Sequence, residues 1–369
     1  TTIFTVISPL DAEHRAVNLV QGFPDFDCDP KLVDCVAAAM RQGLNQYPPM
    51  AGVAGLREAV AAKIETLYGH AYDPASEITI TAGATQAILS AILALVRPGD
   101  EVIVLDPCYD SYDPNIELAG GIAVHVPLTS ATFAPDFERI GASLTPRTRA
   151  IIINTPHNPS ATVWSRADME RLATLLAPTD VIVISDEVYE HMVYDDAPHQ
   201  SVARFPALAE RSVAISSFGK TYHVTGWKVG YAAAPAALMS EFRKVHQFNV
   251  FTVNTPMQHG IASYMTDPAH HLGLAAFYQK KRDLFRAGLA RTRLRMLPSQ
   301  GSFFQCVDYS AVSDLGEEDF CRWLTAEKGV AAIPLSAFYA DGREQHIARF
   351  CYAKKDETLA LALDRLAQL

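Results

Sequence analysis

The sequence predicts an α/β fold in which a mainly parallel sheet of seven strands lies between helices, with a smaller α+β unit beside it. Three observations lead to this prediction. Short runs of apolar, β-branched residues recur between residues 78 and 232, stretches with helical spacing separate most of them, and a second segment of mixed pattern follows residue 295. Near-continuous apolar strands that alternate with helices are typical of a parallel sheet covered on both faces.

The predicted elements follow in chain order. Residues 1–30 are expected to be irregular, and helices are predicted to begin near Pro30 and to cover 56–67, where apolar residues recur at helical spacing. A long helical pattern runs from about residue 255 towards residue 293. The remaining predicted elements are strands at 78–81, 102–105, 122–126, 150–153, 181–184, 213–215 and 229–232, and helices at 85–96, 166–176 and 236–245.

Length and composition are those of an ordinary globular protein. With 369 residues the chain can bury a large core and a smaller companion, so we expect a large ligand-binding domain over 31–265 and a small domain made of 1–30 and 266–369. The net charge of −10 disfavours nucleic acid and anionic membranes as partners. No stretch approaches the ~18 apolar residues of a membrane span.

The cysteines and the first residues bear on location. Residues 1–9 lack the basic-then-apolar order of a signal peptide. The six cysteines form no CxxC pair, which is typical of reduced thiols and gives no sign of a metal site. We therefore expect a cytoplasmic protein without a bound metal.

Polar segments follow five of the seven predicted strands. In an open parallel sheet, ligands bind beyond the carboxyl ends of the strands, so these segments are expected to meet at one rim. Together they supply an aromatic ring, two amides, two acids and a lysine, as well as small residues that are able to hold a phosphate. The segments are 82–85, 106–109, 154–159, 185–189 and 216–220.

Gly83, Ala84 and Thr85 lie between a predicted strand and a helix. Small residues let backbone N–H groups approach an anion, and the positive end of the helix favours a phosphate. A plain strand-to-helix turn capped by Thr85 would give the same pattern, so both interpretations stay open. The glycine spacing of dinucleotide-binding proteins and the P-loop lysine are absent, which disfavours a nucleotide ligand.

Asp186 and Lys220 carry the clearest chemical signals. Asp186 closes an apolar run, where a carboxylate needs a partner such as a protonated heterocyclic nitrogen, an arginine or a helix end. Lys220 stands among small residues, where burial or the nearby Lys228 would lower its pKa and favour a nucleophilic amine. The alternative is an ordinary surface lysine. Tyr189 follows Asp186 on the same rim, as a hydroxyl donor or as a core residue.

Arg349 lies near the end of an apolar strand in the second domain. Its planar guanidinium suits bidentate capture of a carboxylate, and a structural salt bridge is the alternative. Phe338 and Tyr339 come shortly after Pro334 and either line a pocket or fill the core.

Taken together, these segments resemble the fold-type I pyridoxal-phosphate-dependent enzymes, and specifically the class I/II aminotransferases, over nearly the whole chain. Within that family the sequence is most similar to bacterial methionine aminotransferases and kynurenine aminotransferase-like enzymes. The stretches that carry the resemblance are 21–26, 46–50, 154–159, 185–189 and 216–230.

The resemblance implies a role for each site residue. Lys220 would hold pyridoxal 5'-phosphate covalently, Asp186 would keep the ring nitrogen protonated, and Tyr189 would complete the catalytic set. Arg349 would bind the substrate carboxylate with Asn158 and Gly22. The other cofactor contacts would come from Gly83, Ala84, Thr85, Tyr109, Asn158, Tyr189, Ser217 and Lys228, and from Tyr47 across the interface of a homodimer.

Two positions depart from the common pattern of this family. Many relatives have a glycine shortly after the Asn158–Pro159 pair, where residues 160–162 read Ser-Ala-Thr here. Position 228 is often arginine and is lysine in this chain. Neither change removes an essential group, and the first bears on loop geometry and substrate range.

The expected reaction is a ping-pong transfer of an amino group from a neutral amino acid to a 2-oxo acid. No second arginine has a clear role in binding a side-chain carboxylate, so methionine or an aromatic amino acid is the expected donor, with Tyr47, Phe338 and Tyr339 as pocket walls. A carbon–sulfur β-lyase on the same scaffold is the main alternative, because it would use the same lysine, aspartate and arginine. A regulator that senses the cofactor is disfavoured, since the chain has neither an added DNA-binding module nor a basic charge.

Overall fold

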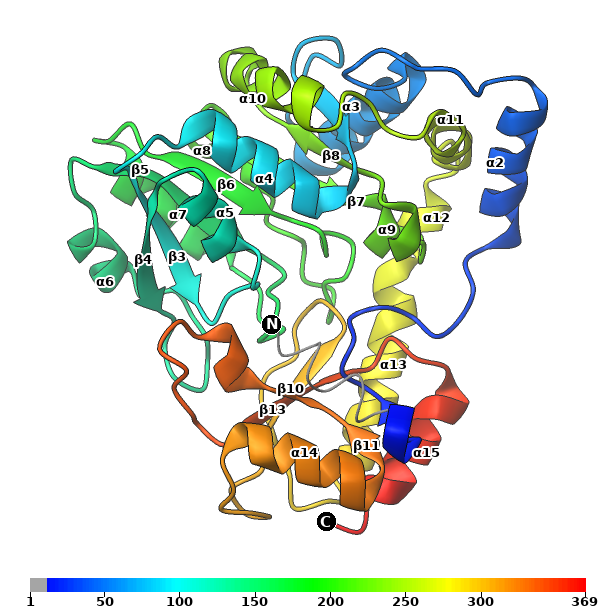
Figure 1. Cartoon of the computed structure of the whole chain (residues 1–369), viewed down its shortest axis with the longest axis vertical. Helices are drawn as coiled ribbons and strands as arrows, with labels where there is room; N and C mark the ends of the chain where they lie inside the picture. Colours follow the sequence, from blue (N-terminus) through cyan, green and yellow to red (C-terminus); the bar gives the residue numbers. More distant parts are fainter. Residues whose placement is uncertain (1–11) are drawn as a thin grey trace.

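The computed structural model describes residues 12–369, and in this part of the chain the central feature is a seven-stranded sheet with the order β2-β8-β7-β6-β5-β3-β4 (Figure 1). Strand β8 runs antiparallel to β2 and β7, and the other neighbours are parallel. The predicted fold class is confirmed, and each predicted run overlaps one strand. The strands are β2 (Ile78–Thr81), β3 (Glu101–Asp106), β4 (Ile122–Pro127), β5 (Thr148–Asn154), β6 (Ile182–Asp186), β7 (Ser212–Ser217) and β8 (Gly230–Ala233).

Alternate residues of the strands face opposite layers of helices. Val102 and Val104 of β3 belong to a core cluster with α4 and α10, whereas Ile103 and Leu105 belong to a cluster with α6 and α7. This period of two follows from the pleat of the strand, and it buries both faces of the sheet as predicted. The helices of these layers are α4 (Gly83–Leu95), α5 (Tyr112–Leu118), α6 (Phe137–Ala142), α7 (Arg166–Leu176), α8 (Pro206–Ala209), α9 (Phe218–Thr221) and α10 (Ala236–Asn249).

Three helices cover the end of the sheet formed by β2 and β8. They are α2 (Pro30–Arg41), α3 (Ala54–Tyr68) and α11 (Thr255–Tyr264), whose apolar residues form a third cluster with the two strands. Helices α2 and α11 approach closely at Gly260, where an added Cβ would lie 2.9 Å from the Cα of Val36. A side chain at this position would push the two helices apart.

The segment after residue 255 differs from the single long helix that its pattern predicts. It forms three helices, α11, α12 (Ala269–Leu272) and α13 (Leu274–Leu289). Pro268 and Gly273 lie at the breaks, because proline lacks the N–H of a continuing helix and glycine disfavours the helix interior. Figure 1 shows α13 extending from the side of the large sheet to the C-terminal unit.

The C-terminal unit (residues 295–369) contains an antiparallel sheet with the order β12-β13-β10-β9. A short strand in the N-terminal segment, β1 (Val17–Asn18), pairs with β11 of this unit, although residues 1–30 were predicted to be irregular. Its partner is far away in the sequence, so local spacing could not reveal it. The elements of the unit are β9 (Arg295–Met296), β10 (Phe304–Asp308), α14 (Glu317–Lys328), β11 (Val330–Ala331), β12 (Ile333–Pro334), β13 (Ile347–Cys351) and α15 (Asp356–Leu366).

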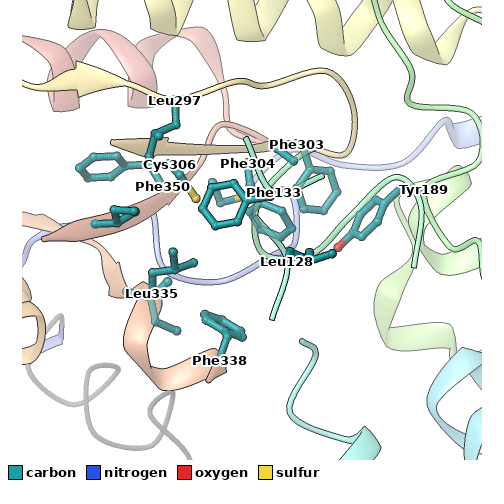
Figure 2. Close-up of a cluster of buried hydrophobic side chains, with 14 of the residues drawn as sticks. Leu128, Phe133, Tyr189, Leu297, Phe303, Phe304, Cys306, Leu335, Phe338 and Phe350 are labelled. Carbon is teal, nitrogen blue, oxygen red and sulfur yellow. The ribbon is translucent and has the colours of Figure 1, made fainter. Parts of the chain in front are cut away.

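One apolar cluster joins the C-terminal unit to the large sheet. Figure 2 shows Tyr189 beside Phe303 at one end of this cluster, with Leu335 and Phe338 at the other. Shared burial of this kind fixes the two units against each other below the carboxyl ends of the strands. Within residues 12–369, no helix combines the length and apolar character needed to cross a membrane.

Candidate active site

A cleft of about 180 Å³ opens where β5, β6 and β7 end, at the position expected for the ligand site of a parallel sheet. Most of the predicted cofactor contacts meet there. The lining residues are Ala84, Thr85, Ile88, Tyr109, Asn154, Asn158, Asp186, Val188, Tyr189, Ser217, Lys220, Thr225 and Lys228.

Lys220 extends into this cleft from the short helix α9, whose first turn is capped by the side chain of Ser217. The Lys220 amine donates to the carbonyl oxygen of Gly22 across 2.6 Å. Burial lowers the pKa of Lys220 to about 8, and the cations Arg349 and Lys228 act in the same direction. Lys220 is therefore a half-buried lysine whose amine has a large neutral fraction near pH 8, and not the surface lysine of the alternative interpretation.

Asp186 is the last residue of β6 and is 4% exposed. The hydroxyl of Tyr112 donates to its Oδ2 across 2.7 Å, and the backbone N–H of Val188 donates to Oδ1. Burial raises the pKa of Asp186 to about 6 despite these bonds. Among the described residues no arginine pairs with the Asp186 carboxylate, so the structural alternative of an ion pair between Asp186 and an arginine is not found.

Tyr112 was not predicted as a site residue. It occupies the first position of α5, one turn after Tyr109, and its ring meets the Tyr109 ring edge-to-face at 5.8 Å. The sequence could have pointed to Tyr112 through its place one turn after Tyr109, a predicted cofactor contact. Its bond to Asp186 depends on how α5 lies against β6, which local pattern does not show.

The start of α4 forms a cradle of small residues. Gly83 has φ 78°, and an added Cβ would lie 3.0 Å from the Nζ of Lys228. Strand β8 also lies close to the start of α4, since an added Cβ at Gly230 would lie 3.2 Å from the backbone nitrogen of Ala84. The helix N-terminus and the lysine amine thus face the same space, an arrangement that suits a phosphate.

Arg349 of β13 is 1% exposed. Its Nη1 donates to Oδ1 of Asn158 across 2.6 Å and its Nη2 to the carbonyl oxygen of Val20, while Nε is buried without a partner. The guanidinium lies over the rings of Phe304 and Phe338, at 4.0 and 4.9 Å. Within residues 12–369 no carboxylate forms an ion pair with Arg349, so the predicted alternative of a structural salt bridge is not found.

Tyr189 and Ala161 show how the surrounding chain holds the site. The Tyr189 ring contacts Phe303 and Phe304 edge-to-face, which fixes its position in the cluster of Figure 2. Ala161, in the loop after Asn158 and Pro159, has φ 63°, a backbone region that favours glycine. The loop therefore adopts the left-handed conformation with an alanine at this position.

Tyr47 lies apart from the other predicted contacts. It is 82% exposed and contacts the ring of Phe251, outside the cleft of its own chain. Phe338, by contrast, is buried beneath Arg349, and Tyr339 accepts a hydrogen bond from Gln345 at its hydroxyl. Phe338 thus supports the arginine from within the core.

Comparison with known proteins identifies the class of this chain. The family model of aminotransferase class I and II matches residues 15–366. Methionine aminotransferase of Escherichia coli is 54% identical over all of this chain and 96% of that protein. A crystal structure of an Escherichia coli protein with a methionine aminotransferase function superposes with a TM-score of 0.98 at 53% identity, over 100% of this chain and 98% of the other. N-succinyldiaminopimelate aminotransferase of Mycobacterium tuberculosis superposes with a TM-score of 0.96 at 40% identity, over 100% of this chain and 97% of the other.

The chain therefore belongs to the class I and II aminotransferases, and it is a pyridoxal-phosphate-dependent enzyme with the fold-type I architecture. The residues of the cleft fit this cofactor. The half-buried amine of Lys220 would serve the aldehyde, and the buried carboxylate of Asp186 would serve the ring nitrogen. The cradle at Gly83, which a Cβ would obstruct, would serve the phosphate.

Proposed function

We propose that the enzyme transfers the amino group of a neutral, largely apolar L-amino acid, such as methionine or an aromatic amino acid, to a 2-oxo acid by a ping-pong mechanism. One observation carries this proposal. Arg349 is a buried cation with an unpaired Nε, it donates to Asn158 of the cleft lining, and the described residues that line the cleft include no arginine for a second carboxylate. We therefore assign Arg349 to the one carboxylate that a neutral amino acid carries, because its guanidinium fork is suited to this group.

The comparisons support an amino acid substrate without fixing its side chain. A relative at 54% identity is named for methionine, a kynurenine–oxoglutarate transaminase of Rattus norvegicus is 35% identical over 98% of this chain and 86% of that protein, and a relative at 40% is named for N-succinyldiaminopimelate. The substrate class proposed here therefore depends on the cations of the cleft.

We assign the following roles to the residues. Lys220 attaches the cofactor, and Asp186, kept ionised by its donors, keeps the ring nitrogen protonated. Tyr189 and Asn158 would hydrogen-bond the phenolic oxygen, and Tyr109 would lie against the ring. The phosphate would be held by Gly83, Ala84, Thr85, Ser217 and Lys228 together with Tyr47 of a second subunit.

When bound, pyridoxal phosphate supplies an electron-withdrawing ring that acidifies the Cα–H bond of the substrate. Arg349 and Asn158 bind the substrate carboxylate with the backbone of Gly22, which fixes Cα near Lys220. The Lys220 amine, with a pKa of about 8, then takes the proton from Cα and returns it one carbon away. One base serves both positions because its flexible chain reaches each.

We further propose a homodimer. Tyr47, Phe248 and Phe251 are exposed aromatic side chains at 82%, 87% and 41%, and Val33 and Met40 on α2 are exposed apolar residues. Exposed aromatic groups of this kind favour an interface. In such a dimer Tyr47 would complete the phosphate site of the other subunit.

The domain boundaries and the location are proposals as well. We place the large domain at 31–265 and the small domain at 1–30 and 266–369, which fits the sheets at 78–233 and 295–351; residues 1–11 lie outside the described part of the chain. The six cysteines are free, which supports the cytoplasm as the location.

A donor panel tests the substrate class. The enzyme loaded with pyridoxal phosphate is incubated with methionine, phenylalanine, kynurenine or aspartate and several 2-oxo acids, and the products are identified. We expect the neutral donors to have the higher kcat/KM, and good turnover of aspartate without turnover of methionine would refute the proposal. Lys220→Ala serves as the inactive control, and release of pyruvate and ammonia from cystathionine without an acceptor would favour the β-lyase.

A further inference from the structure

The tyrosine at the start of α5 makes two contacts with proposed cofactor residues. Its hydroxyl donates to Oδ2 of Asp186 across 2.7 Å, and its ring supports Tyr109 edge-to-face at 5.8 Å. Tyr112 is 2% exposed, and it is absent from the residues that line the cleft. It therefore acts on the site through its two neighbours.

The hydrogen bond has a fixed direction. Burial raises the pKa of Tyr112 well above the ordinary value, and the charge of Asp186 acts in the same direction, so the phenol stays protonated and donates. The carboxylate oxygen is the acceptor. A bond from a neutral donor to a buried anion favours the ionised form of that anion.

The groups around Asp186 leave Tyr112 with a large share of this effect. Burial and the neighbouring Glu187 disfavour the ionised carboxylate, whereas Tyr112, the Val188 N–H and the charge of Lys220 favour it. Of the two hydrogen bonds, that from Tyr112 is the shorter, at 2.7 Å against 3.3 Å from Val188. Moreover, Lys220 ceases to be a free ammonium group once it carries the cofactor.

We propose that Tyr112 is a positioning residue of the transamination: its hydroxyl keeps Asp186 ionised at the cleft, and its ring holds Tyr109 in place for stacking. The inference rests on the site proposed above, in which Asp186 pairs with the ring nitrogen. Without the hydroxyl, Asp186 binds a proton more tightly, and the proton on the ring nitrogen shifts towards the carboxylate. The ring then carries less positive charge and acidifies the substrate Cα less.

Tyr112→Phe tests the role of the hydroxyl, because it keeps the ring against Tyr109 and removes only the donor. In the loaded enzyme, the visible absorbance of the bound cofactor is titrated with pH. A less positive ring lets the nitrogen of Lys220 hold its proton to higher pH, so we expect the midpoint to rise by about one pH unit. We also expect kcat to fall about tenfold with KM changed less than about threefold.

Tyr72→Phe is the matched control. It removes a hydroxyl that is buried without a hydrogen-bond partner, in the cluster below β2 and β8. The titration midpoint and kcat should stay at wild-type values. The thermal unfolding midpoint of both variants shows whether a loss of folding contributes.

Asp186→Asn separates this inference from the site proposal. If Tyr112 acts through the carboxylate, adding Tyr112→Phe to Asp186→Asn shifts the midpoint no further. A shift in Asp186→Asn together with a wild-type midpoint and kcat in Tyr112→Phe overturns the role of Tyr112 alone. Wild-type behaviour of Asp186→Asn itself overturns the site assignment. The ¹⁵N chemical shift of labelled cofactor in Tyr112→Phe gives a second measurement, and an unchanged ring-nitrogen signal also overturns the inference.

Discussion

The guanidinium of Arg349 donates from Nη1 to Oδ1 of Asn158 across 2.6 Å, and this bond joins β13 of the C-terminal unit to the loop after β5. The substrate carboxylate site that we propose is therefore shared between two parts of the chain that lie far apart in sequence. A change in how the C-terminal unit lies against the sheet would move Arg349 relative to Lys220, so we expect substrate binding to be coupled to the position of this unit.

Replacing Arg349 with lysine should lower kcat/KM for the amino donor about 100-fold, because a point charge cannot make the bidentate contact of a guanidinium. Steady-state kinetics with the preferred donor measure this loss. Arg295→Lys is the control, since this exposed arginine pairs with Asp308 at the surface of the same small sheet and should keep wild-type kinetics. Equal kinetics of Arg349→Lys and wild type would contradict the role of Arg349.

Attachment of pyridoxal phosphate to the cofactor-free enzyme should depend on pH through Lys220. Its lowered pKa of about 8 means that the reactive neutral amine is mostly present above pH 8 and falls about tenfold per pH unit below it. Stopped-flow absorbance during cofactor addition gives the rate at each pH. We expect the rate to level off above pH 9. A rate that keeps rising towards the ordinary lysine pKa of ~10.4 would show that burial does not activate this amine.

Glu190 should be a major determinant of stability, because four buried groups donate to its carboxylate. The donors are Lys63, Tyr68, Ser216 and Tyr231, at 2.6 to 2.8 Å. Glu190→Gln leaves the Lys63 ammonium buried without a counter-ion, which should cost about 3–5 kcal/mol of unfolding free energy. Urea denaturation at pH 7 measures this loss.

The Glu190 carboxylate should also make the free energy of unfolding depend on pH. Burial alone would raise the pKa of Glu190, but Lys63 and the other donors lower it overall to well below 4.5. The contribution of Glu190 to the free energy of unfolding is therefore fully present above the pKa that this group has in the unfolded chain. It is lost as the pH falls through the lower pKa that the group has in the folded protein. The difference between Glu190→Gln and wild type should shrink in strong acid. Glu318→Gln, at an exposed pair with Arg322, should change stability by less than about 1 kcal/mol at any pH.

Mixed dimers test whether Tyr47 acts across an interface. Tyr47→Ala and Lys220→Ala subunits with different affinity tags are co-expressed, and each heterodimer should then contain one site with both residues intact. We expect about half of the wild-type activity in purified heterodimers, more than either homodimer shows. A mixture of Lys220→Ala with Asp186→Asn should recover nothing, since both residues belong to the same site. Failure of the first mixture to recover activity would place Tyr47 within its own chain or outside the site.

The strands and the rim of the sheet were readable from the sequence because they depend on local chemistry. Apolar runs with polar ends marked β2 to β8, and the segments after them supplied Asp186, Lys220 and Asn158. The family resemblance then assigned a role to each residue. The long helix predicted after residue 255 was wrong in detail, since the pattern of apolar residues continued past Pro268 and Gly273 whereas the backbone did not.

Only the tertiary structure decided how distant groups meet. The bond from Tyr112 to Asp186, the position of Arg349 on Phe304 and Phe338, and the pairing of β1 with β11 join segments with no shared local pattern. The tertiary structure likewise decided the pKa values of Lys220 and Asp186, because these values depend on how completely the surrounding elements exclude water. Residue types set the available chemistry, and burial and contacts between distant segments set the protonation state in which it operates.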